Sequence, residues 1–445
     1  MVGDGNLTTL TAIEAAEKIA RGEISAEAYT GACLDRIAAI EDKVRAFAHI
    51  DAKDALAQAR ALDERRRNGH AIGPLHGIPV GIKDIFDTAD YKTECGSPLL
   101  KGRQPMRDCT AVARLREAGA VIIGKTVTTE FAYFHPGPTR NPHDPERTPG
   151  GSSSGSAAAV SAGMVPLAIG SQTNGSVIRP AAFCGVYGCK PTHGTISRHG
   201  ALMLSRALDH VGVFARSLAD TALILDVLAG YDPNDSDTRP VAAPAFLETV
   251  AEDPPMPPRI AFVRTPVWHK ADPKTRAAFE GLVGRLGDRA QSIDLPQAYA
   301  AAWDDQRAVM AVDMAHNLDA LVARGGANTS SQQLRDCLAE GRNVSAVRYL
   351  AARDNARRYA AGIAEIFKEY DAIITPATIG VAPKGEATGS PIFCSLWTLT
   401  GLPALSLPLL TGEGGMPLGV QMVGERCDDA RLMRTANWLI NKLEN

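Results

Sequence analysis

An uncharged stretch of 31 residues, from Thr148 to Ile178, constrains the fold of this chain more than any other feature. A segment of this length without Asp, Glu, Lys, Arg or His is long enough to cross a membrane. However, it holds six glycines, two prolines and the serine run from Ser152 to Ser154, so it is too polar and too broken for a spanning helix. We therefore expect no membrane contact. A Gly/Ser-rich segment of this kind is more typical of the buried centre of an enzyme.

The composition is that of a folded, soluble protein. The chain has 445 residues, of which 45% are hydrophobic and 22% charged, and its formal net charge is −3. It has no long Lys/Arg runs, so it lacks the basic surface that binds nucleic acid through phosphates. The N-terminal sequence, MVGDGNLTTLTAIEAAEKIARG, has no apolar block followed by a small-residue cleavage site, so we expect a cytoplasmic protein.

The cysteines and histidines do not show the spacing of metal ligands. The eight cysteines form no CxxC pair, which argues against a zinc ribbon and against a disulfide framework. The ten histidines form no HExxH motif. We therefore expect reduced, mostly buried thiols and no metal site.

Helix and strand signals alternate along the chain, which indicates an α/β protein. The patterns predict three helices before residue 70, the third over about 52–67, and then a buried, edge-like strand over Ile78–Ile82. A helix over about 111–118 leads to the apolar strand AVIIGK (120–125). After a linker rich in Pro and Asp (231–258), RIAFVR (259–264) predicts a strand, and a mainly helical block runs to about 370. DAIITPA (371–377) resumes the first pattern.

The uncharged stretch contains two loops rich in glycine and serine, PGGSSSGS (149–156) and GSQTNGS (170–176). The N–H groups of such loops can bind either a phosphate or the oxyanion that forms when a serine attacks a carbonyl group. The P-loop pattern occurs at Gly119–Thr126, but there it covers a strand, and GxGxxG is absent, so a phosphate site is disfavoured. Gly151–Gly155 fits GxSxG around Ser153. The polar, proline-broken sequence before it argues against a hydrolase elbow, which follows a buried strand.

These loops, together with HGIPVGIKD (76–84), FCGVYGCKPTHGTISRHG (183–200), SRALDHVG (205–212) and GLPALSLP (401–408), resemble the amidase signature family over most of the chain. The resemblance implies Lys83 as the general base, Ser152 as a bridging serine at a cis peptide bond, and Ser176 as the acyl-accepting nucleophile. The interval of 24 residues between the two serines agrees with the family. The resemblance also implies a reaction without cofactor and an oxyanion hole formed by the N–H groups of Thr173, Asn174, Gly175 and Ser176.

We therefore predict one α/β domain over residues 1–445, with an amidase-signature-like mixed β-sheet covered by helices on both faces. Its parts are a helical N-terminal region (1–70), a catalytic core segment (71–230), a linker and mainly helical excursion (231–370), and a C-terminal return to the core (371–445). We expect the excursion to shape the substrate entrance.

Such a triad requires a largely neutral Lys83, because an uncharged amine must accept the proton that Ser152 takes from Ser176. Burial lowers the pKa of a lysine, whereas Asp84 would raise it if its carboxylate faced inward, so we expect Asp84 to point away.

Each of these residues also has a plainer interpretation. Without the resemblance, Ser152 and Ser176, like Ser153, would be hydrogen-bonding residues at helix starts. Cys184 and Cys189 suggest a thiol nucleophile, but we favour packed core thiols.

Three positions depart from many family members: Gln172 replaces Asp, Asn174 replaces Gly and Thr398 replaces Asn. The side chain of Asn174 is expected to narrow or polarise the pocket, while its N–H group remains available. Arg179 stands three residues after Ser176, not two as is common in the amidase subunit of tRNA-dependent amidotransferases. This interval favours a free-standing small-molecule amidase and resembles malonamidase-type members, in which the arginine is linked to a substrate carboxylate. The alternative is an Arg179 that pairs with a structural carboxylate.

The sequence thus predicts an amidohydrolase that cleaves the C–N bond of a small-molecule amide through an acyl-enzyme, giving a carboxylic acid and ammonia or an amine. The alternatives are the amidase subunit of a tRNA-dependent amidotransferase, an esterase or carbamate hydrolase on the same site, and a non-catalytic binding protein on this fold. Tyr133, Phe134 and Trp397 are either walls of the substrate pocket or plain core residues. We expect no nucleic-acid partner and leave a homodimer open.

Overall fold

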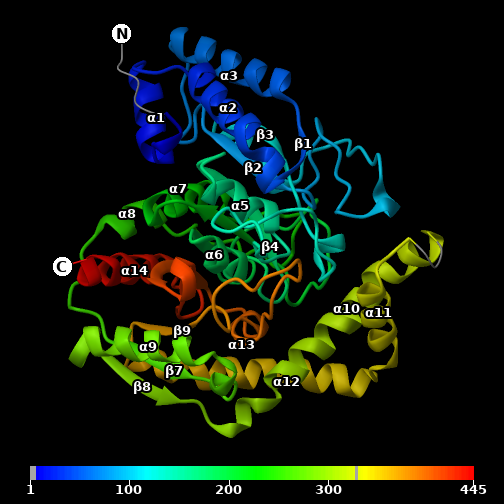
Figure 1. Cartoon of the computed structure of the whole chain (residues 1–445), viewed down its shortest axis with the longest axis vertical. Coiled ribbons are helices and arrows are strands. Elements are labelled where there is room, and N and C mark those ends of the chain that lie inside the picture. Colours follow the sequence, from blue (N-terminus) through cyan, green and yellow to red (C-terminus); the bar gives the residue numbers. More distant parts are fainter. Residues whose placement is uncertain (1–6, 326–328, 445) are drawn as a thin grey trace.

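Three helices form the N-terminal layer, as the sequence predicts (Figure 1). The computed structural model describes residues 7–325 and 329–444, so the first six residues of the N-terminal segment, in which we expect no signal sequence, lie outside the described residues. Thr11 forms a capping box with Glu14 and Gly22 ends the first helix, while Ser25 caps the second. The three helices are α1 (Ala12–Arg21), α2 (Ala26–Val44) and α3 (Ala52–Arg67).

One mixed sheet of eleven strands runs through the described part of the chain, in the order β1-β3-β2-β4-β6-β5-β10-β11-β9-β7-β8. β2 is parallel to β3 and β4, β7 is parallel to β8 and β9, and the other neighbours are antiparallel. The strands are β1 (Phe47–Ile50), β2 (Pro79–Lys83), β3 (Val121–Thr126), β4 (Leu167–Gln172), β5 (Tyr187–Lys190), β6 (His210–Ala215), β7 (Ile260–Arg264), β8 (Ala290–Asp294), β9 (Ala372–Pro376), β10 (Ala404–Thr411) and β11 (Pro417–Val423).

The strand predicted over Ile78–Ile82 is not an edge strand. β2 pairs with β3 on one side and with β4 on the other, and all five of its residues are buried. An apolar run without alternation fits this position, because a parallel strand inside a sheet is covered on both faces. The chain region expected to be helical also contains a strand, β1, which pairs with β3 at the edge of the sheet. The P-loop-like segment Gly119–Thr126 ends in β3, so it is a strand, as predicted.

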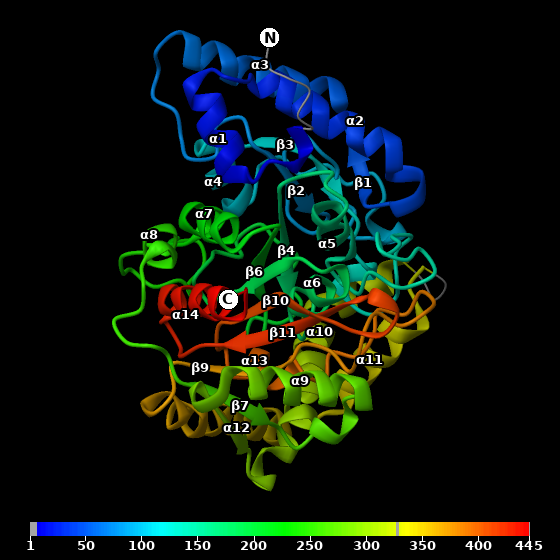
Figure 2. The same cartoon turned by 60° about the vertical axis from the view of Figure 1, so that its left-hand side comes forward.

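Helices cover both faces of the sheet, which confirms the predicted fold class. Figure 2 shows α7, α8 and α14 on one side of the strands and α5 and α6 on the other. α5 contacts β2 and β4, α6 contacts β10 and β11, and α7 contacts β5 and β6. α4 packs against α7. The bounds of these helices are α4 (Thr110–Glu117), α5 (Ser154–Ser161), α6 (Ile178–Cys184), α7 (Leu218–Leu228), α8 (Phe246–Ala251) and α14 (Asp429–Glu444).

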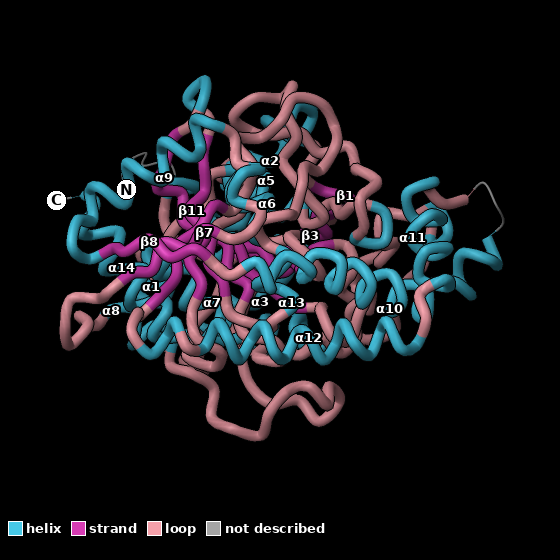
Figure 3. The backbone as a smooth tube through the Cα atoms, turned by 90° about the horizontal axis from the view of Figure 1, so that it is seen from below, coloured by secondary structure: helices cyan, strands magenta, loops and turns pink. Residues whose placement is uncertain are grey.

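The block of residues 231–370 is not only a helical excursion, because it also supplies β7 and β8 at one edge of the sheet. The predicted strand RIAFVR is β7, whereas β8 was not predicted, since its sequence, AQSID, is polar and partly exposed. α10 packs against both α11 and α12, and Figure 3 shows α10 and α12 lying along one another. The helices of this block are α9 (Pro273–Leu286), α10 (Ala302–Gly325), α11 (Gln332–Asn343) and α12 (Ala346–Ala364).

The chain then returns to the sheet with β9, as predicted for DAIITPA, and continues through α13 (Ser395–Leu399), β10 and β11. Seven of the eight cysteines are buried and Cys427 is exposed, and none forms a disulfide. Within residues 7–325 and 329–444, no helix is long and apolar enough to cross a membrane. In the same ranges, no three His, Cys, Asp or Glu side chains are grouped so that they could hold a metal ion.

Candidate active site

The candidate site lies at the carboxyl ends of two parallel neighbours, β2 and β4. β2 ends at Lys83 and β4 ends at Gln172, with Ile82 opposite Ile169 in the register. The loop of residues 173–176 follows β4 directly. Because α5 contacts both strands and begins at Ser154, the serine loop before this helix reaches the same edge of the sheet. Ligand sites in α/β sheets commonly form at such carboxyl ends.

Lys83 is fully buried and faces two serine hydroxyl groups. Its Nζ lies 2.8 Å from Ser152 Oγ and 2.8 Å from Ser171 Oγ. Burial lowers the pKa of Lys83 well below its ordinary value, because the ammonium group loses its hydration; the carboxylate of Asp209 and the thiol of Cys95 raise this pKa to a smaller extent. The site therefore contains a buried amine that contacts Ser152 and whose neutral form is favoured more than in an exposed lysine.

Asp84 points away from Lys83, as predicted. Its carboxylate forms a buried ion pair with Lys125 at 3.0 Å and accepts a hydrogen bond from the N–H group of Glu94 at 3.2 Å. Lys125 also donates to Thr93 Oγ1 at 2.6 Å. The charge of Asp84 is thus balanced by Lys125, and it does not hold a proton on Lys83.

Ser152 lies in a loop that packs closely on β4. The Gly151–Ser152 peptide bond is cis, as the resemblance implies, and Ser152 is fully buried. The Oγ of Ser153 bonds both the N–H and the carbonyl group of Ser171, each at 3.2 Å. A Cβ at Gly170 would lie 2.6 Å from Ser153 Oγ, so glycine is needed for this close approach. Ser153 therefore fixes the serine loop against the strand, in keeping with its structural interpretation.

The loop of residues 173–176 presents four backbone N–H groups that have no acceptor among the described residues. By contrast, the N–H groups of Val177 and Ile178 donate to Gln172 Oε1 at 2.8 and 3.0 Å, which fixes the start of α6. Four unbonded donors in one turn are suited to an oxyanion. Ser176 is 8% exposed, and its Oγ likewise has no hydrogen-bond partner in residues 7–325 and 329–444. The fold thus brings Ser176 to this edge without a hydrogen bond to Ser152.

Side chains from three other segments hold this loop. Thr173 Oγ1 donates to Asp209 at 2.6 Å, and burial raises the pKa of Asp209 to about 6. Asn174 Nδ2 donates to Gln306 of α10 at 3.1 Å, and its Oδ1 accepts from Ser395 of α13 at 2.7 Å. The side-chain amide of Asn174 is therefore engaged by both helices.

The three positions that depart from many family members are linked by hydrogen bonds. Gln172 Nε2 donates to Thr398 Oγ1 at 2.9 Å, and Thr398 Oγ1 lies 2.5 Å from the carbonyl oxygen of Asn174. The departures at these positions thus belong to one network that shapes the loop before Ser176.

Arg179 is buried at the start of α6 and has no carboxylate partner among the described residues. Its Nη2 donates to Gly151 O at 2.6 Å and its Nη1 to Gly389 O at 2.9 Å, while Cζ lies 5.8 Å from the centre of the Phe134 ring. Burial lowers the pKa of Arg179 to about 10. The expected alternative, a pair with a structural carboxylate, is therefore wrong. Two backbone carbonyl groups hold the guanidinium, and one of them directly precedes Ser152.

The aromatic candidates occupy different environments. Phe134 and Tyr133 are partly buried, with ring centres 4.8 Å apart, and Phe134 lies beside Arg179. Tyr133 lies next to Cys337 of α11. Trp397 is fully buried within the core, which favours the core interpretation for this residue over the pocket wall.

The thiol alternative does not fit the structure. Cys184 and Cys189 are buried, and burial raises the pKa of both thiols, so neither favours the reactive thiolate. His193 bonds the carbonyl oxygen of Arg206 at 3.0 Å rather than either sulfur.

Sequence analysis missed four residues that support the site: Ser171, Asp209, Gln306 and Ser395. Ser171 belongs to the GSQTNGS motif, so the signal for it was present. Gln306 lies in α10, far from the motifs in sequence, and nothing near it indicates the contact with Asn174. Ser395 lies in α13, six residues before the GLPALSLP motif, but the motif gives no sign of this contact.

Comparisons with known proteins find similar sequences and folds over nearly the whole chain. The Amidase family profile matches residues 28–433. A curated relative from Roseiflexus castenholzii, a subunit of glutamyl-tRNA(Gln) amidotransferase, is 38% identical, over 97% of this chain and 95% of the relative. The solved peptide amidase of Stenotrophomonas maltophilia is 30% identical, with a TM-score of 0.84 over 98% of this chain and 97% of that one. A chain from "An unexpected vestigial protein complex reveals the evolutionary origins of an s-triazine catabolic enzyme" is 31% identical, with a TM-score of 0.90 over 97% and 98%.

Proposed function

This chain belongs to the amidase family, and we propose that it hydrolyses a small-molecule amide through Ser176, Ser152 and Lys83. The observation that carries the proposal is the buried Lys83 amine, 2.8 Å from Ser152, at the same edge of the sheet as a loop whose four N–H groups have no acceptor within residues 7–325 and 329–444. Acyl transfer to a serine requires a base, a nucleophile and donors for the oxyanion, and this site offers a residue for each role.

In the first half of the reaction, Lys83 accepts a proton from Ser152 as Ser152 takes the proton of Ser176. Ser176 Oγ then forms a bond to the amide carbonyl carbon, and the N–H groups of residues 173–176 stabilise the oxyanion. When the tetrahedral intermediate collapses, the C–N bond breaks and the nitrogen receives a proton from the Lys83–Ser152 relay. Ammonia or an amine leaves, and the acyl group remains as an ester on Ser176.

In the second half, water takes the place of Ser176 as the nucleophile. It loses a proton to the same relay, attacks the ester carbonyl, and releases a carboxylic acid with the proton returned to Ser176. No cofactor takes part in this sequence. An ester or a carbamate would follow the same steps, so the substrate assay must include both.

We further propose that the substrate carries a carboxylate that faces Arg179. A buried guanidinium without a carboxylate partner is costly unless an anion pairs with it. Arg179 has no such partner among the described residues, and it bonds Gly151 O, next to Ser152, so its charge lies close to the reacting atoms. The planar fork of arginine is suited to a bidentate bond with a carboxylate.

A second candidate is the amidase subunit of a tRNA-dependent amidotransferase, which the names of the curated relatives favour. In that case the ammonia would serve a partner protein instead of leaving as a product. The interval of three residues between Ser176 and Arg179 supports the free-standing enzyme, as do structural neighbours that include a peptide amidase.

The test is an ammonia- and amine-release assay on the purified chain with acidic amides, neutral amides, esters, carbamates and glutamine. We expect turnover of amides without a partner, and labelling of Ser176 by a fluorophosphonate. Ser176→Ala should remove turnover and labelling while the fold remains intact, because loss of a nucleophile costs several orders of magnitude in kcat. Hydrolysis of glutamine only in the presence of a partner would favour the amidotransferase reading. Failure to label, or more than about a tenth of the wild-type kcat in Ser176→Ala, would contradict the nucleophile assignment.

A further inference from the structure

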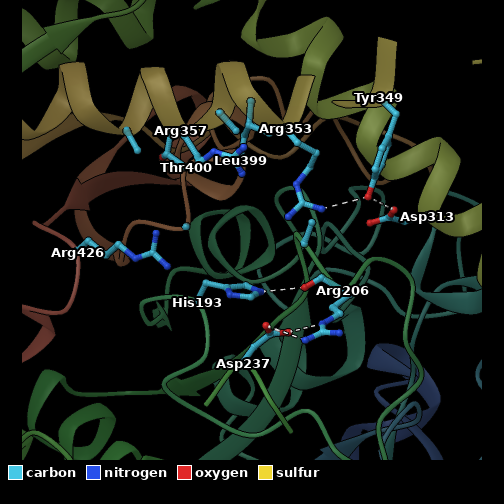
Figure 4. Close-up of a pocket in the computed structure, with 14 residues that line it drawn as sticks. His193, Arg206, Asp237, Asp313, Tyr349, Arg353, Arg357, Leu399, Thr400 and Arg426 are labelled. Carbon is cyan, nitrogen blue, oxygen red and sulfur yellow. Dashed lines mark hydrogen bonds and ion pairs between the residues drawn. The ribbon is translucent and has the colours of Figure 1, made fainter. Parts of the chain in front are cut away.

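A cavity of about 530 Å³ lies outside the candidate active site, between α12 and two loops, one before β6 and one after β11 (Figure 4). Neither Lys83, Ser152 nor Ser176 lines it. Its volume is within the range of cavities that bind small molecules. Four arginines from three separate parts of the chain line this cavity: Arg206, Arg353, Arg357 and Arg426.

Two of these arginines already have carboxylate partners. Arg206 donates from Nε to Asp237 at 2.9 Å, and Asp237 also binds Arg198 at 2.6 Å. Arg357 forms an ion pair with Asp354, one turn earlier on α12. Arg198 also pairs with Asp235 at 2.7 Å, so two carboxylates balance Arg198 and Arg206, and Arg206 leaves no unpaired positive charge in the cavity.

The other two arginines, Arg353 and Arg426, have no carboxylate partner among the described residues. Arg353 donates to the Tyr349 hydroxyl group at 3.1 Å and lies over the Tyr349 ring, with Cζ 5.9 Å from its centre. Arg426 is exposed at the opposite wall. The remaining carboxylate of the cavity, Asp313, accepts hydrogen bonds from Ser205 at 2.5 Å and from Tyr349 at 2.8 Å.

The histidine of the cavity adds a hydrogen-bonding group but no charge. His193 is partly buried, and burial together with the neighbouring Arg198 lowers its pKa to about 4. The formal charges of the lining residues are therefore four positive and two negative. Two guanidinium groups that face one concave space, with no carboxylate partner among the described residues, match the charge and the geometry of phosphate or carboxylate groups.

We propose that this cavity binds a small organic anion with at least two negatively charged groups, through Arg353 and Arg426. Phosphate and carboxylate groups share the required chemistry, because each presents two oxygen atoms to one guanidinium fork. An anion with a single charged group would engage only one of the two arginines and should bind more weakly. The proposal does not depend on the amidase activity, since no residue of the candidate triad takes part.

The test is titration calorimetry of the full chain at constant ionic strength, with pyrophosphate and succinate as the doubly charged probes and phosphate and acetate as their single-group counterparts. We expect at least one doubly charged probe to bind about tenfold more tightly than its counterpart, and Arg353→Gln and Arg426→Gln each to weaken that binding about tenfold. Preference for pyrophosphate identifies a phosphorylated ligand, and preference for succinate identifies a dicarboxylate. Both variants change partly exposed side chains, and circular dichroism verifies their fold.

Two controls separate this cavity from other sources of binding. Arg67→Gln removes an exposed arginine of α3 that lies outside the cavity, and it should leave the affinity unchanged. Ser176→Ala should also bind the probe like the wild type, even if the proposed amidase function is wrong. Absence of saturable binding of both doubly charged probes, unchanged affinity in both cavity variants, or an equal loss in Arg67→Gln would overturn the proposal.

Discussion

Replacement of Ser171 by alanine should slow the reaction while substrate binding is retained. Ser171 Oγ is one of two hydroxyl oxygens at 2.8 Å from the fully buried Lys83 Nζ. A neutral amine has one lone pair and two N–H bonds. If one N–H bond is directed to Ser171, the lone pair can face the hydroxyl group of Ser152 and accept its proton.

The expected size of the effect follows from this single contact. A buried donor that loses its acceptor costs about 1–3 kcal/mol. If the orientation in which Lys83 accepts the proton of Ser152 is destabilised by this amount, kcat drops about 5- to 150-fold, while KM changes little. The pKa of Lys83 should fall further, because a hydroxyl oxygen stabilises the charged ammonium more than the neutral amine. The acid limb of the kcat profile should therefore move to lower pH.

The assay is steady-state kinetics across pH on the best amide of the panel, with Ser156→Ala as the matched control. Ser156 is a fully buried serine, whereas Ser171 is partly buried; the Oγ of Ser156 bonds Thr126 at 2.7 Å and Ile169 O at 2.9 Å, but it does not contact Lys83. Ser156→Ala should lower the free energy of unfolding about as much as Ser171→Ala does, but it should leave kcat unchanged. An unchanged kcat in Ser171→Ala, or an equal loss of kcat in the control, would refute the reasoning.

Three further predictions concern buried cations. Activity should rise with pH as Lys83 loses its proton, and Lys83→Ala should lower kcat and remove this limb; an active variant with an unchanged profile would mean that another group titrates. Arg179→Lys should raise KM for acidic amides more than for neutral amides, since lysine cannot form the bidentate bond; an unchanged ratio of the two KM values would disprove a carboxylate contact. Burial lowers the pKa of Lys190 to about 7 from its ordinary 10.5, so the unfolded chain binds a proton that the folded chain has lost, and the free energy of unfolding should rise with pH over this interval. Lys190→Met should reduce this rise in the free energy of unfolding with pH, which denaturant titrations near pH 7 and near pH 10.5 would measure. An equally steep rise in the variant would show that other groups cause it.

The sequence predicted those parts of the fold and site that depend on local patterns. The helix over about 52–67, which is α3, and the apolar strand that became β9 are predicted from adjacent residues, and both are confirmed. The position of β2 inside the sheet was not predictable in the same way, because a short apolar run looks the same in sequence in an edge strand with one neighbour and in an inner strand with two. The partners of Arg179 also escaped prediction, since they are the backbone carbonyl groups of Gly151 and Gly389, which any residue type could supply.

The network around the loop of residues 173–176 also bears on when the protein becomes competent during synthesis. Asn174 is fixed by Gln306 and Ser395, which follow it by 132 and 221 residues, and Gln172 is bonded to Thr398, 226 residues later. A ribosome has therefore made the candidate nucleophile and base long before it makes the side chains that shape the loop between β4 and α6. Nascent chains that already contain Lys83, Ser152 and Ser176 should remain inert until α13 docks. On the proposed mechanism, hydrolytic competence should therefore appear only after α13 has been synthesised and has docked on the loop of residues 173–176.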